Sequence, residues 1–287
     1  MKSAPFDYHR PSTVDEALAL KDELGGDARI LAGGQSLMPL MHFRLATPAH
    51  LIDVNQLDDL DYVRRSNGYL AIGARTRLQF VLTSAEAASA APLLVEAIGW
   101  VGHVQIRHRG TVVGSVAHAD PSAEIPTVVL ALGGSMVARS TTGEREIMAD
   151  DFFKGPFSTA LADDEILTEV RVPVWPDGTG SAWLEFSRIY HGFPVVGVGA
   201  VVRLHDGVVD RAAIGMCGMA YNAITAPVDA LLGREPTPEV IAEAAEAAVA
   251  GLDPPGDIHG SGPYRVRVGR ACTLRALTAA VAAAGGK

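Results

Sequence analysis

Two glycine-bearing segments constrain the fold of this chain more than any other feature. The first glycine segment comprises residues 31–38 (LAGGQSLM), and the second comprises residues 110–115 (GTVVGS). Glycine permits positive φ and a close approach of backbone N–H groups to an anion, and the neighbouring Ser and Thr hydroxyls add further donors. Either segment alone is typical of a tight turn. Together they indicate the two halves of one phosphate-binding cradle.

The composition is that of an ordinary globular protein. A length of 287 residues with 48% hydrophobic residues suggests about two domains. The net charge of −9 and the scattered basic residues argue against nucleic acid or an anionic membrane as a partner. No apolar signal region or membrane span is recognisable, so we expect a cytoplasmic protein without membrane insertion. Cys217 and Cys272 lie far apart in apolar surroundings, which favours buried free thiols, with one disulfide as the alternative.

The N-terminal part has the pattern of a short β-loop-α-β unit. Thr13 and Glu16 have capping-box spacing, so a helix is expected between Thr13 and Gly25. Strands are expected at residues 28–31 and 50–54, with a helical turn at 37–44 that Pro39 interrupts. This order places the first glycine segment at the carboxyl end of a strand, where open α/β sheets bind their ligands.

A second lobe begins near Tyr62, where two alternating segments flank an Asn67-Gly68 turn and predict an antiparallel hairpin. A helix with Thr76 as its N-cap should follow. The other elements expected in this lobe are helices at 93–101 and 122–132 and strands at 136–139 and 165–172.

Clustered Pro and Gly at residues 173–180 predict a linker between two domains. We therefore predict an α+β chain with one domain at 1–176, made of lobes at about 1–56 and 57–176, and a second domain at 177–287. In the second domain we expect strands to come first and helices to follow. The strands are predicted at 182–187, 195–204 and 208–216, and the helices at 226–232, 238–250 and 264–284.

Several motifs in this order resemble the FAD-binding medium subunit of molybdenum hydroxylases, the group of carbon monoxide dehydrogenase and xanthine dehydrogenase. The resemblance covers essentially the whole chain. The matching segments are residues 32–39 (AGGQSLMP), 51–55 (LIDVN), 105–111 (QIRHRGT), 117–121 (AHADP), 152–153 (FF) and 165–173 (EILTEVRVP).

The resemblance implies a two-lobed FAD-binding domain of the PCMH, or vanillyl-alcohol oxidase-like, type. A small C-terminal domain of antiparallel sheet and helices, like that of the carbon monoxide dehydrogenase flavoprotein, would follow. It also implies FAD as cofactor and a large molybdenum-cofactor subunit and a small [2Fe-2S] subunit as partners, in a heterotrimer that pairs into a dimer. In such an oxidoreductase the medium subunit accepts electrons from iron–sulfur clusters and passes them to an external acceptor. The chain itself has no Cys cluster for an iron–sulfur site.

The resemblance also assigns cofactor-binding positions, and no catalytic or metal-binding residue. Glu124 would bind a ribose hydroxyl, although an acid in the first turn of a helix explains it equally well. Val101 and Leu167 would touch the flavin or simply pack in the core, and Phe193 would shield the isoalloxazine. The implied FAD contacts are Leu31, Ala32, Gly33, Gly34, Gln35, Ser36, Leu37, Met38, Val101, Thr111, Val112, Val113, Gly114, Ser115, Ala117, Asp120, Glu124, Leu167 and Phe193.

The chain departs from the family pattern at Val113, where the family has a glycine. If this position requires positive φ or close cofactor approach, a β-branched residue strains the loop by about 1–3 kcal/mol. We therefore predict weakened FAD binding, which Val113→Gly should restore. A second departure is Ile189-Tyr190, in a segment that often carries a second basic residue.

Other functions find less support in the sequence. A self-contained FAD oxidase of the vanillyl-alcohol oxidase class would need its own substrate pocket, and no acid–base pair is evident after Ala182. A nucleotide-binding scaffold subunit with impaired FAD binding is the other alternative, suggested by Val113. No Gly-x-Gly-x-x-Gly motif supports a nicotinamide enzyme. His118 is expected to hydrogen-bond its loop rather than to bind a metal.

Overall fold

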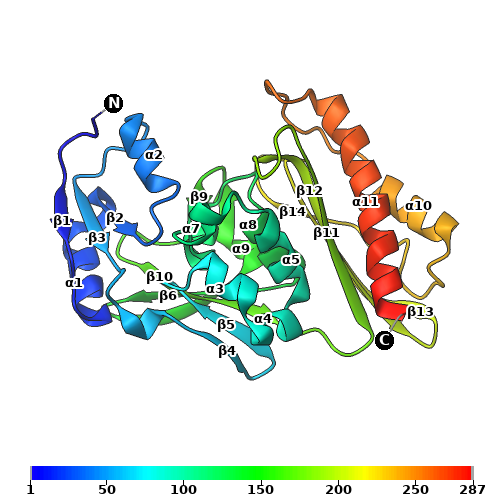
Figure 1. The fold of residues 1–287 in the computed structure, drawn as a ribbon, viewed down its shortest axis with the longest axis horizontal. Helices are drawn as coiled ribbons and strands as arrows, with labels where there is room; N and C mark the ends of the chain where they lie inside the picture. Colours follow the sequence, from blue (N-terminus) through cyan, green and yellow to red (C-terminus); the bar gives the residue numbers. More distant parts are fainter. Residues whose placement is uncertain (1, 286–287) are drawn as a thin grey trace.

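The computed structural model describes residues 2–285, and its three parts follow one another from left to right in Figure 1. The first lobe is a parallel sheet in the order β1-β3-β2, formed by β1 (Asp7–His9), β2 (Ala28–Leu31) and β3 (His50–Asp53). Helices α1 (Val14–Leu24) and α2 (Leu37–His42) belong to this lobe. The predicted capping is confirmed, since the Thr13 hydroxyl accepts the Glu16 N–H at 3.1 Å. Strand β1 was not predicted.

The second lobe is built on a five-stranded antiparallel sheet in the order β4-β5-β10-β6-β7. The predicted hairpin is confirmed, with Asn67 and Gly68 at φ of 48° and 82° in its turn. Strand β7 was missed because its sequence, GEREIM, lies on an exposed sheet edge and carries no apolar alternation. The five strands are β4 (Val63–Ser66), β5 (Tyr69–Gly73), β6 (Ser135–Ser140), β7 (Gly143–Met148) and β10 (Ile166–Pro173).

Short helices surround this sheet, together with a small ribbon of β8 (Phe153–Gly155) and β9 (Ser158–Thr159). Thr76 is not the N-cap that the sequence predicted, because its hydroxyl instead bonds the backbone N–H and carbonyl of Tyr62, both at 2.9 Å. Arg77 is therefore the N-cap residue of α3 (Leu78–Thr83), the first helix of this lobe. The helices are α3 (Leu78–Thr83), α4 (Ala85–Ala90), α5 (Pro92–Trp100), α6 (Val104–Arg107), α7 (Val112–His118), α8 (Glu124–Ala131) and α9 (Ala149–Phe152).

The C-terminal part is an antiparallel sheet in the order β11-β12-β13-β14, covered on its outer face by two helices (Figure 1). The helix predicted at 226–232 is wrong. Ala226 ends β14, the chain then turns over residues 229–233, and Gly233 and Arg234 exchange backbone hydrogen bonds with Val209 of β13. The elements are β11 (Thr179–Ser187), β12 (Pro194–His205), β13 (Val208–Cys217), β14 (Ile224–Ala226), α10 (Pro238–Ala247) and α11 (Gly262–Gly285).

Strand β12 shows how the C-terminal sheet is fixed to the second lobe. Its sequence is apolar without alternation because both faces are buried. One face, including Val198 and Val202, packs in the core shared with α10 and α11, whereas Val201 on the other face joins the core of the second lobe. On β13, a Cβ at Gly215 would lie 2.7 Å from the Ala131 Cβ of α8, so glycine lets that helix approach closely. The predicted α+β fold is confirmed, and no helix within residues 2–285 is long and apolar enough to cross a membrane.

Candidate functional site

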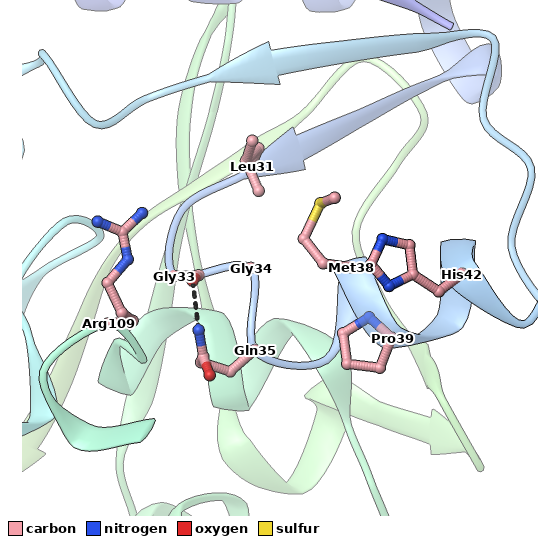
Figure 2. A pocket seen from close by; sticks show the side chains of 8 residues that line it. All are labelled: Leu31, Gly33, Gly34, Gln35, Met38, Pro39, His42 and Arg109. Carbon is pink, nitrogen blue, oxygen red and sulfur yellow. Dashed lines mark hydrogen bonds between the residues drawn. The ribbon is translucent and has the colours of Figure 1, made fainter. Parts of the chain in front are cut away.

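The two glycine segments lie directly against each other, although one belongs to the first lobe and the other to the second (Figure 2). A Cβ at Gly33 would stand 2.5 Å from the Arg109 carbonyl oxygen and 2.7 Å from the Gly110 Cα, so only glycine fits there. Gly34 adopts φ of 72°, the left-handed region that favours glycine. The juxtaposition predicted from sequence is therefore present at backbone level.

A cavity of about 470 Å³ opens beside this contact. Five predicted residues line it, namely Leu31, Gly33, Gly34, Gln35 and Met38. Pro39, His42 and Arg109 line it as well and were not assigned a role from the sequence. In Figure 2 the Arg109 side chain stands beside Gly33, while Met38 and His42 project from α2 on the opposite side. Arg109 could have been found, because a cation next to a glycine-rich anion cradle is a common arrangement.

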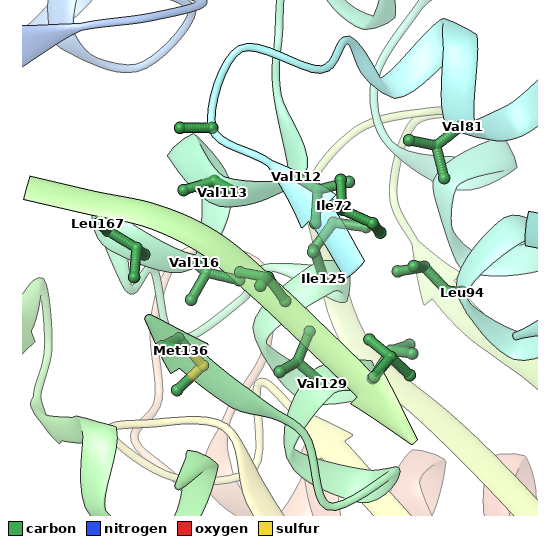
Figure 3. Close-up of a cluster of buried hydrophobic side chains, with 14 of the residues drawn as sticks. Ile72, Val81, Leu94, Val112, Val113, Val116, Ile125, Val129, Met136 and Leu167 are labelled. Atoms are coloured by element: carbon green, nitrogen blue, oxygen red, sulfur yellow. The ribbon is translucent and has the colours of Figure 1, made fainter. Parts of the chain in front are cut away.

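The second glycine segment is not the loop that the sequence predicted. Thr111 is the N-cap of α7, and its hydroxyl accepts the Gly114 N–H at 2.9 Å. Residues 112–115 are helical because Val112, Val113 and Val116 fall on one face and are buried in the core (Figure 3). The segment therefore offers the start of a helix, whose first N–H groups lack intrahelical partners.

This geometry overturns the strain predicted at Val113. The residue lies within α7, is not among the positive-φ residues, and is 2% exposed, with its side chain directed into the core (Figure 3). Val113 therefore does not need positive φ, because a right-handed helix accepts valine and its side chain is buried in the core. Glycine is required one position later, where a Cβ on Gly114 would lie 2.7 Å from the Thr111 hydroxyl.

A polar network ties the contact between the segments to the end of β3. Asn55 donates from Nδ2 to the Ala32 carbonyl at 2.9 Å and to Asp53 Oδ1 at 2.6 Å. The guanidinium of Arg77 donates to Asn55 Oδ1 and to the Arg109 carbonyl. Tyr8 closes the network by donating its hydroxyl to Asp53. Asp53 and Asn55 belong to the matching motif at residues 51–55, but the sequence indicates no role for either.

An acidic cluster lies where α8 meets the C-terminal sheet. Glu124, the first residue of α8, is 7% exposed, and burial raises its pKa to about 8, with smaller contributions from Glu185 and Asp120. Burial also raises the pKa of Glu185 to about 7, and that of the Cys217 thiol on β13. One oxygen of Glu185 accepts the Trp183 indole N–H at 3.1 Å, and the other is buried without a partner among the described residues. The cluster can therefore hold a proton near neutral pH.

The other predicted positions are spread over several elements. Val101 caps α5, Leu167 is 5% exposed in the core beside α7, and Phe193 is 74% exposed on the loop before β12. The hydrogen bond expected of His118 is not found among the described residues, because its ring packs against Phe157 at 5.1 Å. The remaining predicted residues are Ala32 and Ser36 in the loop after β2, Leu37 in α2, Ser115 and Ala117 in α7, and Asp120 after α7.

Both cysteines are unpaired, so the free-thiol prediction is confirmed and the alternative disulfide is not formed. Cys217 is buried on β13, whereas Cys272 on α11 is partly exposed.

Comparison with known families and proteins covers nearly the whole chain. Residues 4–175 match the family described as FAD binding domain in molybdopterin dehydrogenase, and residues 181–280 match the CO dehydrogenase flavoprotein C-terminal domain. The 6-hydroxypseudooxynicotine dehydrogenase complex subunit alpha of Paenarthrobacter nicotinovorans is 40% identical, over 98% of this chain and 96% of that protein. The carbon monoxide dehydrogenase medium chain of Hydrogenophaga pseudoflava is 36% identical, over 96% of each chain.

Solved structures give the same result. A chain of carbon monoxide dehydrogenase from Hydrogenophaga pseudoflava superposes with a TM-score of 0.95 at 37% identity, covering 98% of this chain and 99% of that one. A chain of quinoline 2-oxidoreductase from Pseudomonas putida 86 superposes with a TM-score of 0.93 at 34% identity, covering 100% and 99%. The likeness therefore extends through both lobes and the C-terminal sheet.

Proposed function

We propose a function from one premise: this chain belongs to the family of FAD-binding domains of molybdopterin dehydrogenases. Membership confirms the resemblance inferred from sequence motifs. The chain is an FAD-binding medium subunit of the molybdenum hydroxylase type, part of an oxidoreductase, and FAD is its cofactor.

The proposed partners are a large subunit with the molybdenum cofactor and a small [2Fe-2S] subunit, in a heterotrimer that pairs into a dimer. The names of the relatives support this, since they are a complex subunit alpha, a medium chain and, for caffeine dehydrogenase, a subunit beta. In this arrangement the chain accepts electrons from the iron–sulfur clusters and passes them to an external acceptor. The unpaired cysteines fit the proposed cytoplasmic location.

Two domains are proposed, at 1–176 and 177–287, with the first divided into lobes at about 1–56 and 57–176. The ends of β10 at Pro173 and of β11 at Thr179 support this boundary, as do family matches that stop at 175 and resume at 181. The dinucleotide would lie along the seam between the lobes, where the two glycine segments meet.

The main support for diphosphate binding at this seam is the contact of Gly33 with Arg109 and Gly110 beside the cavity. A Cβ would fill the space at Gly33, and the positive φ of Gly34 turns the chain sharply before α2. Such a surface of backbone and small residues fits a diphosphate. We propose that residues 31–38 and residues 111–115, with Ala117 and Asp120, hold the diphosphate and ribose.

The flavin end is proposed to lie toward the C-terminal sheet. Glu124 is assigned instead to the adenosine-ribose end of FAD, where its buried carboxyl would bind a ribose hydroxyl with little competition from bulk water. Phe193 is exposed and free to cover an aromatic ring, while Val101 and Leu167 would supply apolar contacts. When bound, FAD supplies the electron-transfer chemistry, and these side chains bind and orient it.

Isolation of the chain from its native source, with whatever accompanies it, tests the proposal. We expect flavin absorbance in the visible range and two co-purifying chains, one with molybdenum and one with iron and acid-labile sulfide. A complex that contains both partners but no flavin would contradict the proposed electron transfer through this chain. A chain that purifies alone with FAD and oxidises a substrate would instead identify a self-contained oxidase.

A further inference from the structure

We propose that Arg77 is a positioning residue that sets the spacing between the two glycine segments, and that it acts together with Asn55. The inference rests on the proposed function, since it assumes that these segments hold the diphosphate of FAD. Nothing in the sequence motifs pointed to Arg77, which lies 33 residues before the second segment and 39 residues after the first. The structure brings it to both.

Arg77 is bound firmly to the second glycine segment. Its backbone forms an antiparallel bridge with Thr111, and the next residue, Leu78, donates its N–H to the Gly110 carbonyl at 2.9 Å. The Arg77 guanidinium also donates to the carbonyl of Arg109. This is the carbonyl that contacts Gly33, so the side chain orients the peptide against which the first segment packs.

The same guanidinium reaches the first lobe through Asn55. It donates to Asn55 Oδ1, which leaves the Asn55 amide nitrogen to donate to the Ala32 carbonyl at 2.9 Å. Asp53 Oδ1 fixes the amide by accepting from Asn55 Nδ2 at 2.6 Å and from the Asn55 backbone at 2.8 Å. Arg77 and Asn55 thus connect the carbonyl before Gly33 to the carbonyl before Gly110.

This connection lies beside the proposed site, whereas other polar contacts between the lobes do not. Thr141 donates to Asp22 at 3.3 Å, and Arg139 approaches Asp15 at 3.7 Å, both at the α1 edge of the lobes. Those contacts can hold the lobes together without affecting the glycine segments. Only a bridge at the segments themselves can set the width of a diphosphate cradle between them.

The positive charge of Arg77 also favours a diphosphate between the two glycine segments. The guanidinium is half-buried, and its pKa is lowered by burial and then by the nearby charges of Arg109 and Arg75, so two more cations lie close by. A bound diphosphate would relieve this repulsion. The two groups that bond the guanidinium directly, Asn55 and the Arg109 carbonyl, are neutral, while the carboxylates of Asp61 and Asp53 lie near enough to offset part of the repulsion.

The test measures FAD affinity in the complex after reversible removal of the flavin. Arg77→Met should raise the dissociation constant about 10- to 100-fold, the scale of losing charge-assisted hydrogen bonds. Arg77→Lys keeps the charge but has no planar fork to span both acceptors, so we expect an intermediate loss. Asn55→Ala should weaken binding in the same direction, and the double variant should lose less than the product of the single losses.

Arg139→Met is the matched control, because it also removes an arginine that crosses between the lobes, but at the α1 edge. This variant should keep the FAD affinity within about twofold of the wild-type value, because a solvent-accessible ion pair such as that between Arg139 and Asp15 contributes little. Melting of the flavin-free complex separates positioning from folding: the Arg77 variants should melt close to the wild type. If Arg77→Met does not fold, Arg77→Lys and Asn55→Ala carry the same test.

Unchanged FAD affinity in the Arg77 variants, or fully multiplicative losses with Asn55→Ala, would overturn the inference while leaving the proposed function intact. A wild-type complex that takes up no FAD after flavin removal would instead count against the proposed function. The two failures are therefore distinguishable.

Discussion

The two glycine segments look alike in sequence but have different structures. The first segment is an open turn: Gly34 has a left-handed φ, and residues 31, 33, 34, 35 and 38 line a cavity. The second segment is a helix start whose valines are buried and whose Gly114 packs on the Thr111 hydroxyl. Glycine beside a hydroxyl residue thus allows a left-handed turn in the first segment and a close side-chain contact in the second.

From this contrast we expect a different part of each segment to be sensitive to substitution. In the first segment the backbone itself forms the surface, so added atoms block it. In the second segment the side chains anchor the helix, so removed atoms loosen it. The expected effects of four substitutions follow from this contrast.

Gly33→Ala should have the largest effect. The added Cβ would stand 2.5 Å from a backbone oxygen and 2.7 Å from a backbone carbon, neither of which can move without displacing the second segment. We expect a cost of about 3 kcal/mol, the upper range for overpacking, and a loss of FAD affinity of about 100-fold. The flavin content per chain after gel filtration measures the loss of FAD affinity.

The control is Gly99→Ala in α5, where a Cβ meets nothing within 4 Å. This variant should keep its flavin and gain about 0.5–1 kcal/mol of stability, because alanine favours the helix. Normal flavin content in Gly33→Ala would show that the two segments separate when FAD binds.

Val113→Gly tests the second segment directly. It should destabilise the chain by about 2–3 kcal/mol, from the lost apolar burial and the poor helix propensity of glycine. Val113→Ala, which keeps the helix propensity, should cost about 1.5 kcal/mol. Denaturant unfolding with both variants measures the difference. Tighter FAD retention in Val113→Gly would restore the strain interpretation and show that α7 rearranges around the cofactor.

Glu124→Gln tests whether the helix that follows the second segment begins with a protonated acid. The folded-state pKa of about 8 lies above the unfolded value, so the folded state binds the proton more tightly and stability falls as pH rises toward 8. The Gln variant should lack this fall, gaining about 2 kcal/mol relative to wild type between pH 6 and pH 8. Unfolding curves at pH 5, 6, 7 and 8 measure the difference.

Exposed Glu23→Gln is the control for Glu124→Gln and should leave the pH profile of stability unchanged. Parallel profiles for wild type and Glu124→Gln would mean that Glu124 is ionised in the folded chain.

Thr111→Val should have the smallest effect. It keeps the shape of the side chain but removes the oxygen that accepts the Gly114 N–H, at a cost of about 1 kcal/mol. Thr111→Ser retains the oxygen and should behave nearly as wild type. Thermal unfolding of the two variants, compared at equal flavin content, measures the contribution of the cap. A loss in Thr111→Ser with none in Thr111→Val would instead assign the role of Thr111 to its methyl group.

Local sequence signals predicted much of the fold. The helix after Thr13, the strands around the first glycine segment and the Asn67-Gly68 hairpin are confirmed, because each depends on neighbouring residues: a cap, a short apolar run or a turn. Strand β7 and the segment after Ala226 were missed or wrong for the opposite reason. The backbone of β7 pairs with β6, and the segment after Ala226 turns back to bond Val209 of β13, so both depend on a neighbouring strand rather than on their own residues.

The amino-acid sequence is enough to identify the family and the cofactor class, and to predict that two distant glycine segments belong together. Motif order and residue type carry that information without coordinates. Tertiary structure alone decided that Gly33 packs against the Arg109 peptide, that residues 112–115 are helical, and that Arg77 joins Asn55 to the second segment. These features depend on atoms brought together from separate lobes, and the direction in which Val113 points is fixed by the core behind it rather than by its neighbours in sequence.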